Sequence, residues 1–344
     1  MITNLIKKLF GIGLKIDTGV RVEPTYITER QIHFNEIVAS ANPVEWKELD
    51  TKDLPEYTVY DQSQTLSCVA HTRALMASIM YKLRTNKWVD FSPSWIYWFR
   101  INFPDGGMQA TDSFEIIANK KGLLPLSFFG VPKTEKEINS LKPEAYFNDI
   151  ADGLKADRLI VLPAGDFDTV ASVMQTTGKP VMVWFYITNK EWKDVPTAIR
   201  KSDAHHSVTF IPPTDPSKPT WGLYKGKKAI VIQDSWGLKS TSFKGKRIIT
   251  EDFFKARNSY ADYFMRFKFD QGSGGKPSYV GSIISLQKCL QYEGLFPSNV
   301  SFVEIHGPIT KEAVNKFQIK YGLSPTGTGF VGPATKAKLE ALYP

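Results

Sequence analysis

The sequence predicts an α+β protein, with a body that consists of a helical half and a β-sheet half, followed by a small three-helix bundle. Three observations support this fold class. The first half of the body carries apolar residues at helical spacing, and its second half carries β-branched and aromatic runs bounded by turn residues. After the body, the segment DQGSGGKPS at 270–278 has the Gly- and Ser-rich composition of a flexible linker.

Three segments predict the helical half. The run CVAHTRALMASIMYKLRTN at 68–86 has apolar residues three and four positions apart, which is typical of a helix. The loop FSPSW then introduces a second helical segment that ends near Phe99. The segment PDGGMQATDSFEIIANKKGLL at 104–124 predicts a Gly-Gly turn and a helix that Gly122 ends.

Four apolar runs predict the strands of the second half. They are KPVMVWFYI at 179–187, HSVTFIPP at 206–213, WGLYKGKKAIVIQDS at 221–235 and YFMRFKFD at 263–270. Helices followed by strands form two subdomains, and the boundary between such subdomains is a natural place for a site.

The chain therefore divides into four parts. We expect a leader or short pro-segment at 1–50, a body at 51–269, the linker at 270–278 and a C-terminal domain at 279–344.

Composition narrows the class of partners. The net charge of +8 favours anionic surfaces, but the basic residues are spread along the chain, which argues against nucleic acid. Two cysteines cannot form a disulfide framework, and their usage is typical of a reducing compartment. The N-terminal segment lacks a signal-peptide cleavage site, and no apolar run is long enough to span a membrane. We expect a monomer that is made in the cytoplasm without a signal peptide.

The chemistry of the body centres on Cys68. A thiol at a helix N-terminus is stabilised as thiolate by the helix dipole, and His206 and Asp234 could supply a base and the group that orients it. Gln62 could place its amide beside the Cys68 N–H as a second oxyanion donor. Taken singly, a cysteine or histidine beside an apolar run is more often a packing residue. The ordered set favours catalysis, because the separation of Cys68 and His206 falls within the roughly 130–150 residues typical of papain-type enzymes.

Two other histidines are alternatives. His205 adjoins His206 and cannot face the same side of a strand, and His71 on the first helix is interpreted as a packing or surface residue. Cysteine and histidine residues lack metal-binding spacings such as C-x-x-C or H-E-x-x-H, so we expect neither a metal nor a cofactor.

These segments resemble the papain family of cysteine peptidases over residues of about 50 to 270. DQSQTLSCVAHTRA is similar to the family's Q-x-G-x-C-G-S-C-W-A-F segment, HSVTFI to its H-A-V strand, and QDSWG to its N-S-W-G. The resemblance implies that Cys68 is the nucleophile, His206 the base and acid, and Gln62 the oxyanion donor. It also implies that Trp236 shields the His–Asp pair and that Gly106 and Gly107 contact the substrate, with Gly107 along its backbone.

The sequence departs from that family in several places. Asp234 stands where the family has asparagine, which implies a Cys-His-Asp triad. Leu-Ser-Cys-Val replaces Gly-Ser-Cys-Trp, and the family's disulfide cysteines do not occur here. We also expect no long inhibitory propeptide. Because aspartate can still accept the imidazole N–H, these departures leave an active enzyme as the expectation.

The C-terminal domain shows three helical patterns joined by glycine turns, and Cys289 lies in the first as a core residue. It resembles the three-helix type of peptidoglycan-binding domain over residues 279 to 342. The resemblance implies wall-contacting residues. They are His306, Gly307, Thr310 and Gln318. The segment IHGPIT departs from the family's D-G-x-F-G at the loop that borders the expected ligand groove.

Together these resemblances imply a cysteine endopeptidase that is carried to bacterial peptidoglycan, where it acts after release or export. Its substrate could be a peptidoglycan peptide, as for a phage-type lytic enzyme, or a protein associated with the wall. The alternative is a non-catalytic wall-binding or structural protein on a papain-like scaffold.

Overall fold

A computed structural model describes residues 31–33, 43–152, 154–188, 190–198, 204–267, 279, 281–297 and 306–343. The predicted linker at 270–278 and most of the predicted leader lie outside these residues. The described leader residues belong to the body. Residues 31–33 form strand β1 (Gln31–His33), and Leu49 donates its N–H to the carbonyl of Leu223 at 2.9 Å.

The helical half contains the long helix α3 and shorter helices around it. Its elements are α3 (Cys68–Thr85), α4 (Pro93–Trp98), α5 (Ala110–Glu115), the π-helical turn η1 (Ile116–Lys120), the 3-10 turn η2 (Leu126–Phe128), α6 (Glu135–Ser140) and α7 (Phe147–Asp152). Local sequence explains their ends. Asn86 adopts the left-handed conformation that ends α3, and the Ser92 hydroxyl caps α4 by accepting from Trp95 N–H.

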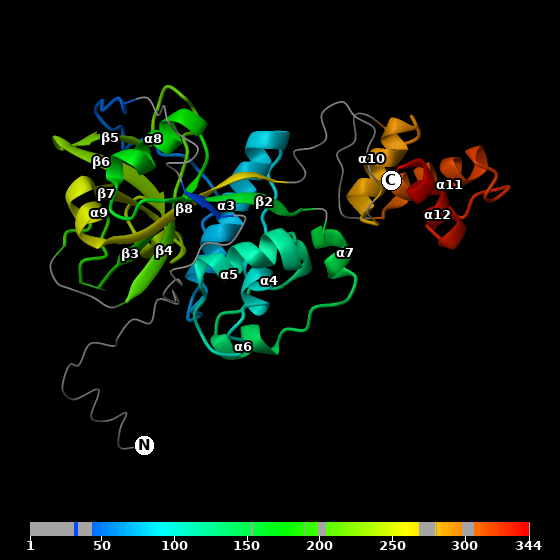
Figure 1. Cartoon of the computed structure of the whole chain (residues 1–344), viewed down its shortest axis with the longest axis horizontal. Helices are drawn as coiled ribbons and strands as arrows, with labels where there is room; N and C mark the ends of the chain where they lie inside the picture. The colour runs from blue at the N-terminus through cyan, green and yellow to red at the C-terminus, as the bar shows by residue number, and fades with distance from the viewer. Residues whose placement is uncertain are drawn as a thin grey trace, which may run out of the picture.

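In the described residues, the sheet half is one eight-stranded sheet, and two helices pack on the face opposite α3. The elements after β1 are β2 (Ala156–Leu162), α8 (Phe167–Thr177), β3 (Val181–Tyr186), β4 (His205–Phe210), β5 (Trp221–Tyr224), β6 (Lys227–Gln233), η3 (Leu238–Ser240), β7 (Lys246–Thr250), α9 (Glu251–Arg257) and β8 (Asn258–Phe267). The strand order in the sheet is β1-β2-β8-β3-β4-β6-β5, with β7 paired to β6. Figure 1 shows α4 to α7 on one side of α3 and β3 to β7 on the other.

The burial of both faces of strand β3 explains why its sequence is a continuous apolar run. Met182 and Trp184 pack in the cluster that contains α3, while Val181, Val183 and Phe185 pack in the cluster that contains α8 and α9. Because both faces of the strand are buried, its residues do not alternate between apolar and polar.

The long helix is fastened to the sheet by buried polar contacts. Arg73 on α3 forms an ion pair with Asp262 on β8, with nitrogen–oxygen distances of 2.5 and 2.6 Å and no exposure of either side chain. One turn after Cys68, Thr72 accepts a hydrogen bond from the Ser207 hydroxyl on β4 at 3.1 Å. The Arg73 ion pair holds α3 against β8, and the Thr72 hydrogen bond holds it against β4, the strand that carries His206.

The C-terminal helices are α10 (Ile283–Tyr292), α11 (Pro308–Lys320) and α12 (Pro333–Leu342). Their inward side chains form a separate core. It contains Leu286, Cys289, Leu290, Phe296, Ala313, Val314, Phe317, Leu339 and Tyr343. The predicted fold class, an α+β body followed by a three-helix bundle, is confirmed.

Candidate active site

Cys68 is the first residue of α3 and is buried. None of the residues in the first turn of this helix is acidic, so none of them offsets the positive end of the helix dipole. The Cys68 side chain thus begins at a helix end that favours negative charge.

His206 lies on β4, beside the start of α3. Its Nε2 is 2.7 Å from Asp234 Oδ1, so this nitrogen is the one that carries a proton toward the carboxylate. Its Nδ1 is buried and has no hydrogen-bond partner among the described residues. A ring held by one nitrogen, with the other available, has the arrangement that a general base requires.

Asp234 directly follows β6, and four donors surround its carboxylate. Oδ1 faces His206 and accepts from the Ser235 N–H at 2.7 Å, while Oδ2 accepts from Trp192 Nε1 at 2.8 Å and Arg247 Nε at 2.9 Å. Burial opposes the charged form, but the charges of His206 and Arg247 and these hydrogen bonds outweigh it and lower the pKa of Asp234 to about 2. The group beside the imidazole is therefore a carboxylate at any physiological pH.

Aromatic rings enclose the His–Asp pair. The Trp236 ring lies 5.0 Å from the His206 ring and the Trp192 ring lies 5.6 Å from it, measured between centroids. The Arg247 guanidinium lies over both indoles, at 4.8 Å from Trp192 and 5.8 Å from Trp236. The sequence predicted the shielding position of Trp236. It gave no signal for Trp192 or Arg247, which reach the pair from a loop and from β7.

Gln62 is fixed on the same side of the site by Ser235. Its Oε1 accepts from the Ser235 hydroxyl at 2.6 Å, and its backbone N–H donates to the Ser235 carbonyl at 2.8 Å. Its Nε2 donates to the Thr65 carbonyl at 3.0 Å, so the amide nitrogen points to the loop that ends at Cys68. Ser235 thus connects Gln62 to Asp234, the hydrogen-bond partner of His206.

The two alternative histidines, His205 and His71, contact residues other than Asp234. His205 is half-buried, and its ring packs against Tyr186 on the neighbouring strand at 4.1 Å. His71 is buried, and its Nδ1 is 3.0 Å from both the carbonyl and the hydroxyl of Ser67. Burial lowers the pKa of His71 to about 4, so it is neutral near pH 7 and acts as a packing residue.

The Gly-Gly turn does not present its main chain as the sequence predicted. Gly107 is buried, and its N–H donates to the Tyr97 hydroxyl at 2.8 Å while its carbonyl accepts from Asn102 Nδ2 at 3.1 Å. A substrate could pair with Gly107 only by exchanging these bonds. The φ of 82° at this residue explains why glycine is needed there.

Two residues predicted to contact peptidoglycan are buried inside the C-terminal domain. Thr310 accepts from Gln287 Nε2 at 2.9 Å. Gln318 donates to the Thr335 hydroxyl at 2.9 Å and accepts from the Thr328 N–H at 2.7 Å. The polar groups of Thr310 and Gln318 form hydrogen bonds within the domain and hold its helices and loops together. The prediction that these two residues contact the wall is therefore wrong.

The other two predicted wall contacts, His306 and Gly307, are half-buried. The His306 ring stacks on Phe330, with centroids 6.4 Å apart and planes 12° apart, and Phe330 is 63% exposed. Lys311 Nζ lies 5.2 Å from the centre of the Phe330 ring. We name this set the His306–Phe330 patch, composed of His306, Gly307, Lys311 and Phe330.

Two absences concern only the residues that the structure describes. In them, no group of three or more His, Cys, Asp or Glu side chains is placed to hold a metal ion. Within the same ranges, every helix is too short or too polar to cross a membrane.

Comparison with known proteins supports both parts of the chain. Residues 281–339 match the sequence family described as "Putative peptidoglycan binding domain". Among curated proteins, none matches this sequence.

Two solved structures resemble the body. Xylellain, a cysteine protease from Xylella fastidiosa, has a TM-score of 0.55 and 16% identity, over 74% of this chain and 98% of its own. Digestive procathepsin L 3 of the Tenebrio molitor larval midgut has a TM-score of 0.54 and 16% identity, over 69% of this chain and 74% of its own. At this identity the similarity establishes the fold. The chain thus joins a body with the fold of papain-like cysteine proteases to a C-terminal domain of the peptidoglycan-binding family.

Proposed function

We propose that this protein is a cysteine endopeptidase with a Cys68–His206–Asp234 triad, carried to bacterial cell wall by its C-terminal domain. The observation that carries the proposal is the buried His206–Asp234 pair beside the N-terminus of α3, where Cys68 is the first residue. The fold of the body and the family of the C-terminal domain support the two halves of the proposal.

The residues divide the reaction as follows. His206 Nδ1 takes the thiol proton of Cys68, and the resulting thiolate attacks the carbonyl carbon of the scissile peptide bond. The Cys68 N–H and the second N–H of Gln62 Nε2 stabilise the oxyanion of the tetrahedral intermediate. The His206 imidazolium then donates its proton to the leaving amine, and water hydrolyses the thioester by the reverse proton path. Asp234 holds the imidazole and stabilises its charged form.

The alternative is a non-catalytic wall-binding protein on the same scaffold. A peptidyl epoxide separates the two functions, because it alkylates an activated thiolate in a peptide-binding site. We expect one epoxide per chain, attached to Cys68 and located by mass spectrometry. Absence of labelling in folded, reduced protein would favour the scaffold.

The bond that is cleaved is best found with two substrates in parallel. The full chain is incubated with purified sacculi and with casein, and the released fragments are identified by mass spectrometry. Release of stem- or bridge-peptide fragments from sacculi would support a lytic enzyme of the phage type. Cleavage of casein alone would support a protein substrate at the wall. In either case we propose that the enzyme reaches the wall after lysis or export.

Binding to the wall is proposed to use the His306–Phe330 patch. Its exposed ring and neighbouring Lys311 suit a polymer of sugars and carboxylated peptides. Burial and the charge of Lys311 lower the pKa of His306, so its ring is neutral near pH 7. We therefore predict that Phe330→Ala in the full chain weakens binding to sacculi, measured by pull-down, by about 30-fold, the loss expected for one binding hot spot.

Tyr292→Ala is the matched control, because Tyr292 is also an exposed aromatic residue of the C-terminal domain, at 60% exposure. It should bind as the wild type does. A second comparison uses a chain truncated after Asp270, which should cleave soluble peptide but lose sacculus binding. Binding of that truncated chain at the wild-type level would assign the anchor to the body instead.

A further inference from the structure

Two loops of the candidate site lie against each other. The pre-nucleophile loop, residues 62–67, leads from Gln62 to Cys68, and the Gly-Gly loop is residues 105–107. Leu66 of the first loop covers Gly106 of the second so closely that a Cβ atom on Gly106 would lie 2.3 Å from Leu66 Cδ1. The position of one loop therefore constrains the position of the other.

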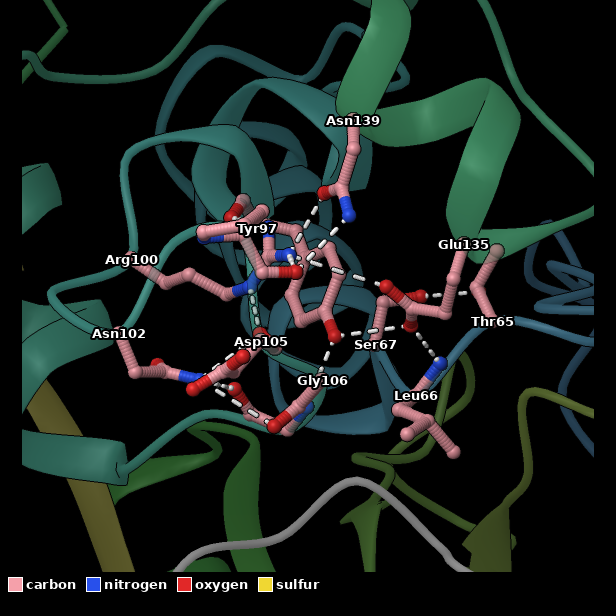
Figure 2. Close-up of polar contacts among 12 residues, drawn as sticks. Thr65, Leu66, Ser67, Tyr97, Arg100, Asn102, Asp105, Gly106, Glu135 and Asn139 are labelled. Carbon is pink, nitrogen blue, oxygen red and sulfur yellow. Dashed lines mark hydrogen bonds and ion pairs between the residues drawn. The ribbon is translucent and has the colours of Figure 1, made fainter.

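A single carboxylate bonds to one loop directly and to the other through a tyrosine. Glu135, the first residue of α6, accepts at Oε1 from the Leu66 backbone N–H and from the Tyr97 hydroxyl, the latter at 2.9 Å. The Tyr97 hydroxyl in turn accepts from the Gly107 N–H at 2.8 Å. Figure 2 shows Glu135 and Tyr97 between Leu66 and the Gly-Gly loop. We call this pair the Glu135–Tyr97 clamp.

Arg100 contacts both the clamp and the Gly-Gly loop. Arg100 Nη2 lies 3.7 Å from Glu135 Oε2, and the same guanidinium donates to the carbonyls of Asp105 and Pro104 at 2.7 and 2.8 Å. Its charge offsets the carboxylate while it also holds the Gly-Gly loop. Burial and the Glu135 charge both raise the pKa of Tyr97, so its hydroxyl stays protonated and keeps donating to Glu135.

We propose that Glu135 and Tyr97 are positioning residues, which fix the Gly-Gly loop against the pre-nucleophile loop. The inference rests on the proposed peptidase function, since it assigns the clamp to that same site. The two residues have separable effects. Glu135 bonds to Leu66 directly and to the Gly-Gly loop through Tyr97, so its loss affects the oxyanion donor Gln62 and the Gly-Gly loop together. Tyr97 bonds to the Gly-Gly loop and leaves the Leu66–Glu135 bond in place.

The kinetic test uses the full chain and a peptide copied from a casein site that the wild type cleaves. Active sites are counted with the peptidyl epoxide, so that kcat refers to competent enzyme alone. We expect Tyr97→Phe to raise KM about 10-fold with little change in kcat, the scale set by one or two lost hydrogen bonds. Glu135→Ala should raise KM similarly and also lower kcat about 10-fold, while Glu135→Gln, which keeps an Oε1 acceptor, should recover most of both.

Two matched controls should behave as wild type. Tyr57→Phe removes a hydroxyl that donates to the Pro212 carbonyl, and Glu137→Gln alters an exposed carboxylate on the same short helix as Glu135. A residue that only stabilised the fold would reduce the number of titratable sites and leave KM and kcat per site unchanged. That result in Tyr97→Phe and Glu135→Ala would overturn the inference. A lower KM in Tyr97→Phe would overturn it too, because the hydroxyl would then compete with substrate for the Gly107 N–H.

Amide hydrogen exchange tests the clamp without any catalysis. Glu135→Ala should speed exchange at Leu66 and Gly107, whereas Tyr97→Phe should speed it at Gly107 alone. Unchanged exchange in both variants would contradict the clamp. If wild-type Cys68 does not react with the epoxide and neither casein nor sacculi are cleaved, the proposed function fails, and the exchange pattern still reports on the clamp.

Discussion

Replacing Cys68 with alanine is expected to abolish peptide hydrolysis, whereas replacing Cys289 with alanine should leave it near the wild-type rate. Cys68 begins α3, which packs against the strand that carries His206, and in the proposed mechanism its thiol makes the covalent intermediate. Loss of a catalytic nucleophile lowers kcat by roughly 10⁴- to 10⁶-fold. Cys289 lies in the core of the C-terminal domain, where burial raises the pKa of its thiol to about 12 and keeps it un-ionised.

The measurement is kcat with the casein-derived peptide, with thermal melting to check that each variant is folded. Cys68→Ser is a useful third variant, because it keeps the size of the side chain while replacing the thiol. Low activity in Cys68→Ser with a wild-type melting temperature would exclude a mere packing defect. Equal losses in Cys68→Ala and Cys289→Ala would refute the assignment of Cys68 as nucleophile.

Local patterns in the sequence were sufficient to predict the elements that carry the proposed triad. Helix α3 has apolar residues at helical spacing, and its start is marked by a loop rich in polar residues. Strands β4 and β6 are β-branched runs, and Asp234 directly follows the second of them. Because each of these signals extends over a few neighbouring residues, the sequence could place Cys68, His206 and Asp234 on their elements.

The residues that the sequence missed are brought together by contacts between distant segments. Arg247 belongs to the short segment KGKRIIT, whose charges are typical of a surface, yet it is buried because Asp234 and two indoles surround it. Glu135 and Tyr97 lie on two short helices, and their link to Leu66 and Gly107 exists only in the folded chain. Neither arrangement has a periodicity that a sequence could display.

In the C-terminal domain, the sequence pattern could not separate residues that contact a ligand from residues that hold the fold. Gln318 and Thr310 belong to the pattern by which the sequence resembles its family, but both are buried and bonded within the domain. A pattern shared by a family includes residues needed for folding as well as residues that contact a ligand. The exposed Phe330 was not among the predicted contacts, since only the folded domain shows that its ring is uncovered beside His306.

Asp234→Asn is expected to lower both stability and activity, because Asp234 has partners besides His206. An asparagine can turn its oxygen toward His206 Nε2, but its NH₂ group then faces Trp192 Nε1 and Arg247, which are both donors. Arg247, which is buried, would lose its counter-charge, and breaking a buried ion pair in this way costs about 3–5 kcal/mol. Replacing Arg247 as well, in Asp234→Asn/Arg247→Met, should recover most of the lost stability.

The stability of the folded protein should depend on pH through the Asp234 carboxylate. The pKa of Asp234 is lowered to about 2 in the folded protein, so its contribution to stability is present above pH about 4 and is lost as the pH falls toward 2. Asp234→Asn should therefore remove an acid-dependent component of the unfolding free energy, measured as melting temperature against pH. The melting temperatures of Asp234→Asn and the wild type should differ by a constant amount above pH about 4 and converge as the pH falls toward 2, and profiles that stay parallel over that range would contradict the prediction.

Activity should fall in the same variants. The Asp234 carboxylate lies 2.7 Å from His206 Nε2 and holds the imidazole in the proposed triad, whereas an asparagine oxygen can accept from Nε2 only while its NH₂ group faces two donors. Asp234→Asn should therefore lose activity, and Asp234→Ala should lose more, because alanine has no acceptor for the imidazole N–H. The measurement is kcat/KM per epoxide-titrated site for the three proteins. Wild-type kcat/KM in both variants would mean that Asp234 does not orient His206, and the proposed triad would be wrong.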